Sequence, residues 1–297
     1  MNINTYQDSK LISLTSQTAS QYLNSTYLSN VMFETQGFLI RNANLIKLEI
    51  SLVHAEIPVS FYIINYTNNQ FQYKLGTGSI ITASIPVGNY NANTLITALQ
   101  TVVNNVAFLI TINKITGVLT FNYNTSFIIY TSNNNTIAKI LGLNTAVTSI
   151  VSVTNSITAS YPLNLLGIKK LNISSSKLTT NNYVSGVGST SLLACLSVDQ
   201  PSFGLIIYQN QSGSKYSLGN KEILNIDIQI TDESFNYINF NNIDWALLFS
   251  ITATYDVSID NNAPLINTIK PEISKEEKPN NDPNPQLEQL EFLTNKV

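Results

Sequence analysis

Histidine and cysteine are the side chains most often recruited for general-base, nucleophilic or zinc chemistry, and this chain of 297 residues has one of each. His54 lies in "SLVHAEI", where it shares the parity of Leu52 and Glu56 within a predicted strand. Cys195 lies in "SLLACLSV", an apolar setting typical of a buried thiol rather than a nucleophile. With no second histidine, a zinc site would need an unusual ligand set. We therefore expect a packed or rim histidine and no metal site.

Acidic side chains are the second group of candidates for chemistry. They are Asp227, Asp232, Glu233, Asp244 and Asp256. Two carboxylates flanking a sugar could hydrolyse a glycoside, and closely alternating oxygen ligands could bind calcium. Here the carboxylates are spread over one turn and two strand exteriors, and Asp244 more simply anchors the start of a strand. Neither a G-x-S-x-G elbow nor a Walker-type Gly-Lys-Ser/Thr loop occurs. We expect no catalytic residue and no cofactor, and hence no enzyme; a β-sandwich hydrolase is kept as an alternative.

The amino-acid composition limits the kinds of partner that the chain can be expected to bind. Only 11% of the residues are charged, against about 25% in typical soluble domains. The net charge is −3, and the clustered Lys and Arg that neutralise phosphates are lacking, so no specific nucleic acid is expected. The N-terminal stretch has no basic segment followed by an apolar one, and no apolar run approaches the roughly 18 residues of a spanning helix. We expect no signal peptide, no transmembrane segment, and assembly in a cytosol-like compartment.

Strands must position most of these side chains. From Trp245 to Val257, apolar residues fall on one parity and Ser and Thr on the other, which is the period of a half-buried strand. The run from Leu224 to Thr231 alternates in the same way, with Asp227 on the polar, water-facing parity. A turn rich in Asn and Asp joins the two runs. Trp245, the chain's one tryptophan, is therefore expected in the core of a sheet.

Changes in composition and in apolar periodicity divide the chain into four parts. Residues 1–30 are polar and predict an extended N-terminal arm or a disordered terminus. Residues 31–70 and 144–263 hold many short strands with Asn, Gly and Ser turns, which favours a jelly-roll β-sandwich. Residues 71–143 predict an inserted α+β subdomain, and residues 264–297 a tail rich in Pro, Glu, Lys and Asn. The expected fold is mainly β: a single jelly roll with an inserted small α+β subdomain and polar terminal arms.

The predicted insert mixes strands with helical spacing. Its helix is marked by four apolar residues on one face, Leu95, Leu99, Val102 and Val103, with Asn91 or Asn93 as the N-cap. A strand pair around "GTG" precedes the helix, and a hairpin with Gly117 in its turn follows it. The strand "SFIIYT" and a second short helix, "NTIAKILGL", complete the insert.

Four segments of the chain together resemble a known family. They are "IPVSFYIIN", "IPVGNYNANTLITAL", "ITGVLTFNY" and "LNIDIQITDESFNYINFNNIDWALLF". In this order they resemble the penton (minor capsid) proteins of virophages, of the Mavirus type, and of related polinton-like and giant-virus lineages. The resemblance runs from about Leu45 to Tyr255. Its most specific part is met by Asp232, Phe240, Asp244 and Trp245, to which it assigns structural roles.

The resemblance implies a structural viral capsid protein rather than an enzyme. Such a penton is a jelly roll standing at the icosahedral fivefold vertex of the virion, five copies to a capsomer, with the inserted domain projecting outward. It would close the pentamer hole in a lattice built by a major double-jelly-roll capsid protein. The homopentamer would assemble in the host cytoplasm or a viral factory. A cyclic assembly of this kind requires two different complementary faces on each subunit.

Two other readings of the chain stay open. It could be another minor capsid or spike protein of the same lineages, because those proteins also use jelly rolls. It could also be an attachment module that binds a host-surface glycan through the insert. The aromatic candidates for that contact are Tyr73, Tyr90, Tyr123 and Tyr130, for which core or cross-strand packing is the favoured interpretation.

The tail offers one more hypothesis. Three leucines, Leu287, Leu290 and Leu293, together with Phe292, could form one short amphipathic helix that clasps a neighbouring subunit or an internal capsid protein. Truncation after Asn262 would then weaken particle assembly without unfolding the body. Normal particle yield from the truncated chain would refute the clasp.

Overall fold

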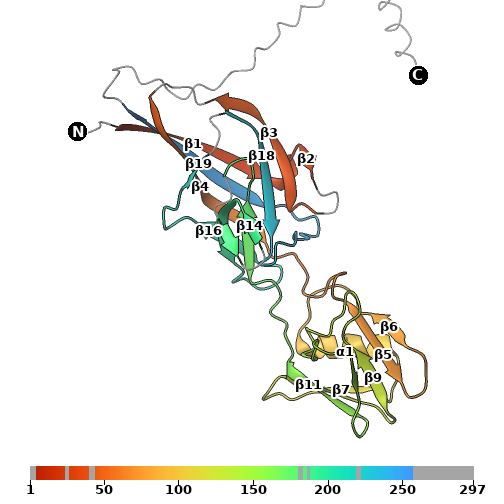
Figure 1. Cartoon of the computed structure of the whole chain (residues 1–297). Helices are drawn as coiled ribbons and strands as arrows, with labels where there is room; N and C mark the ends of the chain where they lie inside the picture. The colour runs from red at the N-terminus through yellow and green to blue at the C-terminus, as the bar shows by residue number, and fades with distance from the viewer. Residues whose placement is uncertain are drawn as a thin grey trace, which may run out of the picture.

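The structure is a computed structural model that describes residues 5–23, 27–39, 44–179, 183–185, 188–218 and 222–256. These residues form two bodies joined by two chain segments (Figure 1). The larger body, here called the sandwich, contains two packed antiparallel sheets. The smaller one, here called the second body, spans residues 63–165 and has its own hydrophobic core. The predicted tail, residues 264–297, lies outside the described residues, as does its proposed clasp.

The first sheet of the sandwich has the strand order β1, β19, β4, β16, and β17 also pairs with β4. Its strands are β1 (Thr5–Thr15), β19 (Ala246–Asp256), β4 (Leu45–Pro58), β16 (Leu205–Gln209) and β17 (Tyr216–Ser217). The second sheet has the order β15, β12, β18, β3, β2. Its strands are β15 (Leu192–Ser197), β12 (Lys170–Ser174), β18 (Glu222–Thr231), β3 (Asn30–Leu39) and β2 (Gln21–Tyr22). A 3₁₀ turn, η1 (Ser16–Thr18), follows β1, and a hairpin of β13 (Tyr183–Ser185) and β14 (Gly188–Thr190) precedes β15.

The chain passes repeatedly from one sheet to the other. β3 and β18 are neighbours in one sheet, while β4 and β19, which follow them in the chain, are neighbours in the other. β1 then pairs with the last strand, β19, over its whole length. The mainly β sandwich that the sequence predicts is confirmed, and its strand order is compatible with the two Greek keys of a jelly roll.

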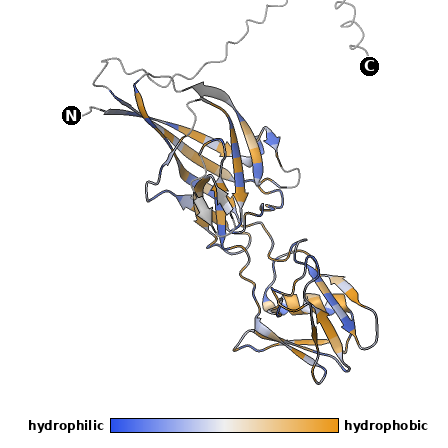
Figure 2. Cartoon of the chain, viewed as in Figure 1, coloured by the Kyte–Doolittle hydropathy of each residue, from blue (hydrophilic) through white to orange (hydrophobic). Residues whose placement is uncertain are grey.

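The sandwich core is formed by the inward parity of its strands. In β19 the parity of Trp245 is buried at every position through Tyr255, as the alternation predicts. Side chains from β3, β12 and β18 of the second sheet meet them in one cluster. Figure 2 shows the apolar residues interspersed with polar ones along these strands.

The structure corrects three predictions about single side chains, two of them through irregular strand pairing. The register of β18 shifts between Ile223 and Asn225, so Leu224 is 55% exposed although its parity predicts burial. Asp227, predicted on the water-facing side, is only 3% exposed. In β4 the register shifts around Val53, so His54 shares its face with Glu56 but not with the buried Leu52.

The prediction that Cys195 is buried is wrong. Cys195 is exposed, because it points away from the core between the buried Ala194 and Leu196. Residues 5–15, which lie in the predicted N-terminal arm, are extended and form the edge strand β1. Backbone pairing with β19 satisfies this polar segment despite its weak apolar alternation.

The second body contains one helix and two small sheets. The helix α1 (Ala92–Val103) starts with a capping box between Asn91 and Thr94, so the Asn91 N-cap expectation is met. The sheets have the strand orders β10, β9, β5, β6 and β11, β8, β7. These strands are β5 (Gln70–Leu75), β6 (Ile81–Ser84), β7 (Leu109–Ile112), β8 (Val118–Asn122), β9 (Phe127–Tyr130), β10 (Ser149–Val151) and β11 (Ser156–Pro162).

The second body differs from the predicted insert in two respects. Residues 135–143, predicted as a second short helix, form turns. The core also recruits Ile64 and Ile157, which lie outside the expected limits of 71–143. Treating the two bodies as separate domains stays a proposal. No helix in the described ranges is long and apolar enough to cross a membrane.

Candidate functional site

Trp245 joins the two sheets of the sandwich. Its side chain is 1% exposed at the start of β19. The indole Nε1 donates a hydrogen bond of 2.9 Å to the carbonyl oxygen of Leu28, just before β3. Its ring meets Phe33 of β3 edge to face, with 6.2 Å between the ring centroids. The buried ring therefore has both an apolar and a polar partner from the opposite sheet.

A serine far away in the sequence completes this corner. The hydroxyl of Ser16 donates to a carboxylate oxygen of Asp244 at 2.6 Å, and the backbone N–H of Trp245 donates to the Ser16 oxygen at 3.2 Å. The backbone N–H of Ser16 donates to the Trp245 carbonyl at 3.1 Å. Ser16 is fully buried. The end of β1 is thus tied to the start of β19, and sequence reasoning missed Ser16 because nothing local marks it.

Asp232 and Phe240 organise the loop between β18 and β19. One carboxylate oxygen of Asp232 accepts backbone hydrogen bonds from Ser234 at 2.8 Å and Asn236 at 2.9 Å, and the other accepts one from the Asn236 side chain. Phe240 is buried against Phe61, and its carbonyl accepts a 2.6 Å hydrogen bond from Ser60. The loop is therefore held against the segment that leaves β4.

A buried carboxylate belongs to Asp227 of β18, which the sequence predicted on a strand exterior. It accepts hydrogen bonds from the hydroxyls of Ser175 and Ser176, at 2.7 and 2.8 Å, and from the backbone N–H groups of Ser176 and Lys177. Burial opposes ionisation of Asp227, but these four hydrogen bonds outweigh it and hold the pKa of the carboxyl below its ordinary value. Asp227 thus fixes the turn after β12.

The four tyrosines predicted as ligand contacts occupy different environments. Tyr73 is buried, with its hydroxyl 3.4 Å from the Val103 carbonyl, and burial raises its pKa. Tyr123 packs against Phe108 and Phe127. Tyr90 donates to the Pro86 carbonyl at 2.7 Å. Tyr130 is half-buried in β9. A ligand role for these four stays a prediction, and the burial of Tyr73 weighs against its part in one.

A cleft of about 1020 Å³ lies where the two bodies meet. Its walls are the segments that connect the bodies, the loop before β16 and the loop between β18 and β19. Asp232, singled out by the sequence, lies in its lining, beside several aromatic side chains that the sequence did not single out. Among the described residues no group of three or more His, Cys, Asp or Glu side chains could hold a metal ion. The arrangement can hold strands together, and it leaves an open cleft with room for a ligand.

Comparison with solved structures found a likeness to this chain. No protein-family model matches the sequence, and no curated protein matches it. The chain is similar to the crystal structure of the selenomethionine-labelled mavirus penton protein, at 9% sequence identity and a TM-score of 0.45. The match covers 84% of this chain and 100% of that one. A likeness of this size does not establish a shared family.

Proposed function

We propose that the chain is a structural capsid protein that forms homopentamers at the fivefold vertices of an icosahedral virion. The observation that carries the proposal is the strand order of the sandwich, in which the chain crosses repeatedly between two sheets as in capsid jelly rolls. The second body leaves the sandwich at one end, between β4 and β12 (Figure 1). The sequence signature ending in Asp244 and Trp245 adds support, because both residues close a corner of the sandwich.

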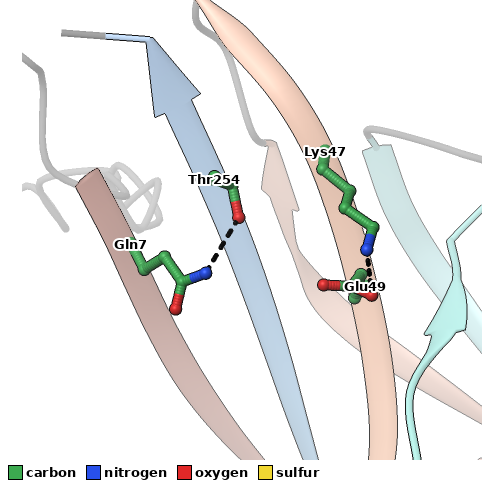
Figure 3. A network of polar contacts seen from close by, with 4 residues as sticks. All are labelled: Gln7, Lys47, Glu49 and Thr254. Atoms are coloured by element: carbon green, nitrogen blue, oxygen red, sulfur yellow. Dashed lines mark hydrogen bonds and ion pairs between the residues drawn. The ribbon is translucent and has the colours of Figure 1, made fainter. Parts of the chain in front are cut away.

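The outer face of the first sheet suits burial against a neighbouring subunit. Figure 3 shows two contacts on this sheet: Gln7 reaches Thr254 at 3.5 Å, and Lys47 pairs with Glu49 at 2.7 Å. Ser9 and Thr252 lie 3.2 Å apart between the same strands, β1 and β19. The face therefore carries short hydroxyl side chains, of which Thr252 and Thr254 are already covered by their neighbours, and the charges of Lys47 and Glu49 are paired. Such a surface can be covered at little cost in desolvated, unpaired charge.

A labelling experiment tests the vertex position. A short epitope tag would be inserted beside Ile115, an almost fully exposed residue in the hairpin turn of the second body. The tagged chain would be assembled with the lineage's major double-jelly-roll capsid protein, and antibody-labelled particles would be imaged by electron microscopy. Labels at the fivefold vertices are expected. A tag beside Gly213 in an open turn of the sandwich is the control for accessibility.

Labels away from the vertices would contradict the proposal. So would particles that contain neither the tagged nor the untagged chain. Labels at a different class of position would favour another minor capsid or spike protein. In that case the jelly roll would still be a capsid component, with a different place in the lattice.

A further inference from the structure

The cleft between the bodies, named the interlobe cleft, is framed by segments held in fixed positions. The two connecting segments pass close to each other at Gly167 and Ile63. A Cβ atom added to Gly167 would lie only 3.2 Å from Cγ1 of Ile63. The Asn89 side chain accepts a 2.9 Å hydrogen bond from the backbone N–H of Ile63. With a volume of about 1020 Å³, the cleft has the size of a small-ligand site, and such sites favour domain interfaces.

Aromatic side chains from three separate segments line the interlobe cleft. They are Tyr27, Phe61, Tyr62, Tyr66, Phe235 and Tyr237. Tyr66 is 72% exposed and Tyr237 is 37% exposed, so both rings can be reached from solvent. None of the four tyrosine hydroxyls has a hydrogen-bond partner within the described residues, whereas Tyr73 and Tyr90 donate to backbone carbonyls. The cleft therefore presents flat apolar faces with unused donors at their rims.

The loop that carries Phe235 and Tyr237 is held rigidly. Asp232 binds three N–H groups of this loop with its two carboxylate oxygens. Phe235 has a backbone φ of +64°, a left-handed conformation that a bulky residue rarely adopts and that these bonds maintain. The backbone that carries two aromatic residues of the cleft is therefore fixed before any ligand arrives.

The charges around the interlobe cleft select against an anionic ligand. Its lining includes the carboxylates of Asp232 and Glu233 and a single cation, Lys139. Recognition of phosphate, sulfate or sialic acid would use clustered Arg or Lys. Asp232 already uses both its oxygens, which leaves Glu233 as the lining carboxylate able to accept hydrogen bonds from a ligand. An uncharged, hydroxyl-rich ligand fits this set of groups.

From these observations we propose that the interlobe cleft binds a neutral oligosaccharide. The apolar face of a pyranose ring stacks on Tyr66 or Tyr237, and the ring hydroxyls bond the phenol groups and Glu233. This proposal is independent of the vertex role, and it moves glycan recognition from the second body to the joint between the bodies. Pairing of an amphipathic ring with amphipathic tyrosines supplies both the apolar contact and the polar specificity.

The test uses the full chain and defined probes. Chitotetraose, cellotetraose and mannotetraose serve as neutral probes, and sialyllactose serves as the anionic one, with binding measured by titration calorimetry and saturation-transfer NMR. Tyr66→Ala removes an exposed ring and is expected to weaken the best neutral probe by about tenfold. Tyr237→Phe removes only a hydroxyl and should weaken it by about threefold. Tyr161→Ala is the matched control, because this tyrosine is 60% exposed on β11 and lies outside the cleft lining.

Binding of a neutral probe that Tyr66→Ala weakens and Tyr161→Ala leaves unchanged supports the proposal. Three results would each overturn it: no binding by any neutral probe, preference for sialyllactose, or equal loss in the Tyr66 and Tyr161 variants. Shielding of Tyr66 by the major capsid protein, without any sugar binding, would assign the cleft to a protein partner and overturn it as well. Circular dichroism of each variant confirms that the fold is retained.

Discussion

The sandwich and the second body bury different kinds of side chain. Among the described residues, every buried polar side chain except Thr131 lies outside the second body. The sandwich encloses Asp227 and Ser16 in hydrogen-bonded groups. The core of the second body is instead a cluster of rings in mutual contact, which are Phe71, Tyr73, Phe108, Phe121, Tyr123 and Phe127.

The two bodies are therefore held together in two different ways. In the sandwich, polar groups lock segments that are far apart in sequence, as when Ser16 meets Asp244. In the second body, rings from neighbouring segments fill one core, and the hydrogen bonds at Tyr73 and Tyr123 join residues of this body alone. The sandwich should therefore be sensitive to changes in single polar atoms and to acid, while the second body should respond mainly to packing.

The largest expected effect is a steric clash that destabilises the second body and leaves the sandwich unchanged. In Gly142→Ala a Cβ atom would lie 2.1 Å from the Tyr161 carbonyl oxygen, at a backbone φ of +71°. We expect the second body to lose about 4 kcal/mol or more of stability, while the sandwich keeps its protection in hydrogen exchange read by mass spectrometry. Gly213→Ala, at a φ of +65° with no atom within 4 Å, is the matched control and should cost about 1–2 kcal/mol. Equal effects of the two changes would contradict the steric account.

Removal of the tryptophan tests the corner between the sheets. Trp245→Ala should lower the free energy of unfolding of the sandwich by about 3–5 kcal/mol, as expected for a buried ring. Trp245→Phe keeps a ring near Phe33 but loses the hydrogen bond to Leu28, and should cost about 1–2 kcal/mol. Urea unfolding followed by circular dichroism measures both. Unchanged stability of the alanine variant would remove Trp245 from the core.

Asp227 tests whether the buried polar group stabilises the sandwich. Asp227→Ala leaves the donors of Ser175, Ser176 and Lys177 without their acceptor and should cost about 2–4 kcal/mol at neutral pH. The folded-state pKa of Asp227 is lowered, so its ionic contribution is present above the unfolded pKa of about 3.9 and is lost as the pH falls through the folded value.

Stability of the wild-type chain and of Asp227→Ala should therefore converge in acid. Thermal unfolding between neutral pH and about pH 2 measures the difference. A constant difference over this range would show that the charge of Asp227 contributes nothing, and that only its shape matters.

The smallest expected effect on stability concerns the outer face of the first sheet. Leu11 is 62% exposed on β1, and Leu11→Glu should change the free energy of unfolding by less than about 0.5 kcal/mol. If this face is buried between subunits, the same change should abolish the pentamer, because it inserts an unpaired charge. Val106→Glu, at a fully exposed position of the second body, is the control. Intact pentamers from the Leu11 variant would exclude this face as the contact.

Strong local patterns were predictable from the sequence. The alternation from Trp245, the helix capped by Asn91 and the turn at Gly117 each depend on neighbours in the chain, and each is found. β1 was missed because its inward parity carries Asp8 and Lys10, which interrupt the apolar signal. The exposure of Leu224 follows from shifted strand pairing, which no single sequence shows. The interlobe cleft brings together segments separated by more than a hundred residues, so its tyrosines gave no common signal.

The native mass of the purified chain, measured by light scattering alone and with the major capsid protein, tests the proposed vertex role most directly. A species near five times 32.8 kDa, either alone or only on mixing, is the predicted result. A stable monomer of 32.8 kDa that ignores the capsid protein would contradict it.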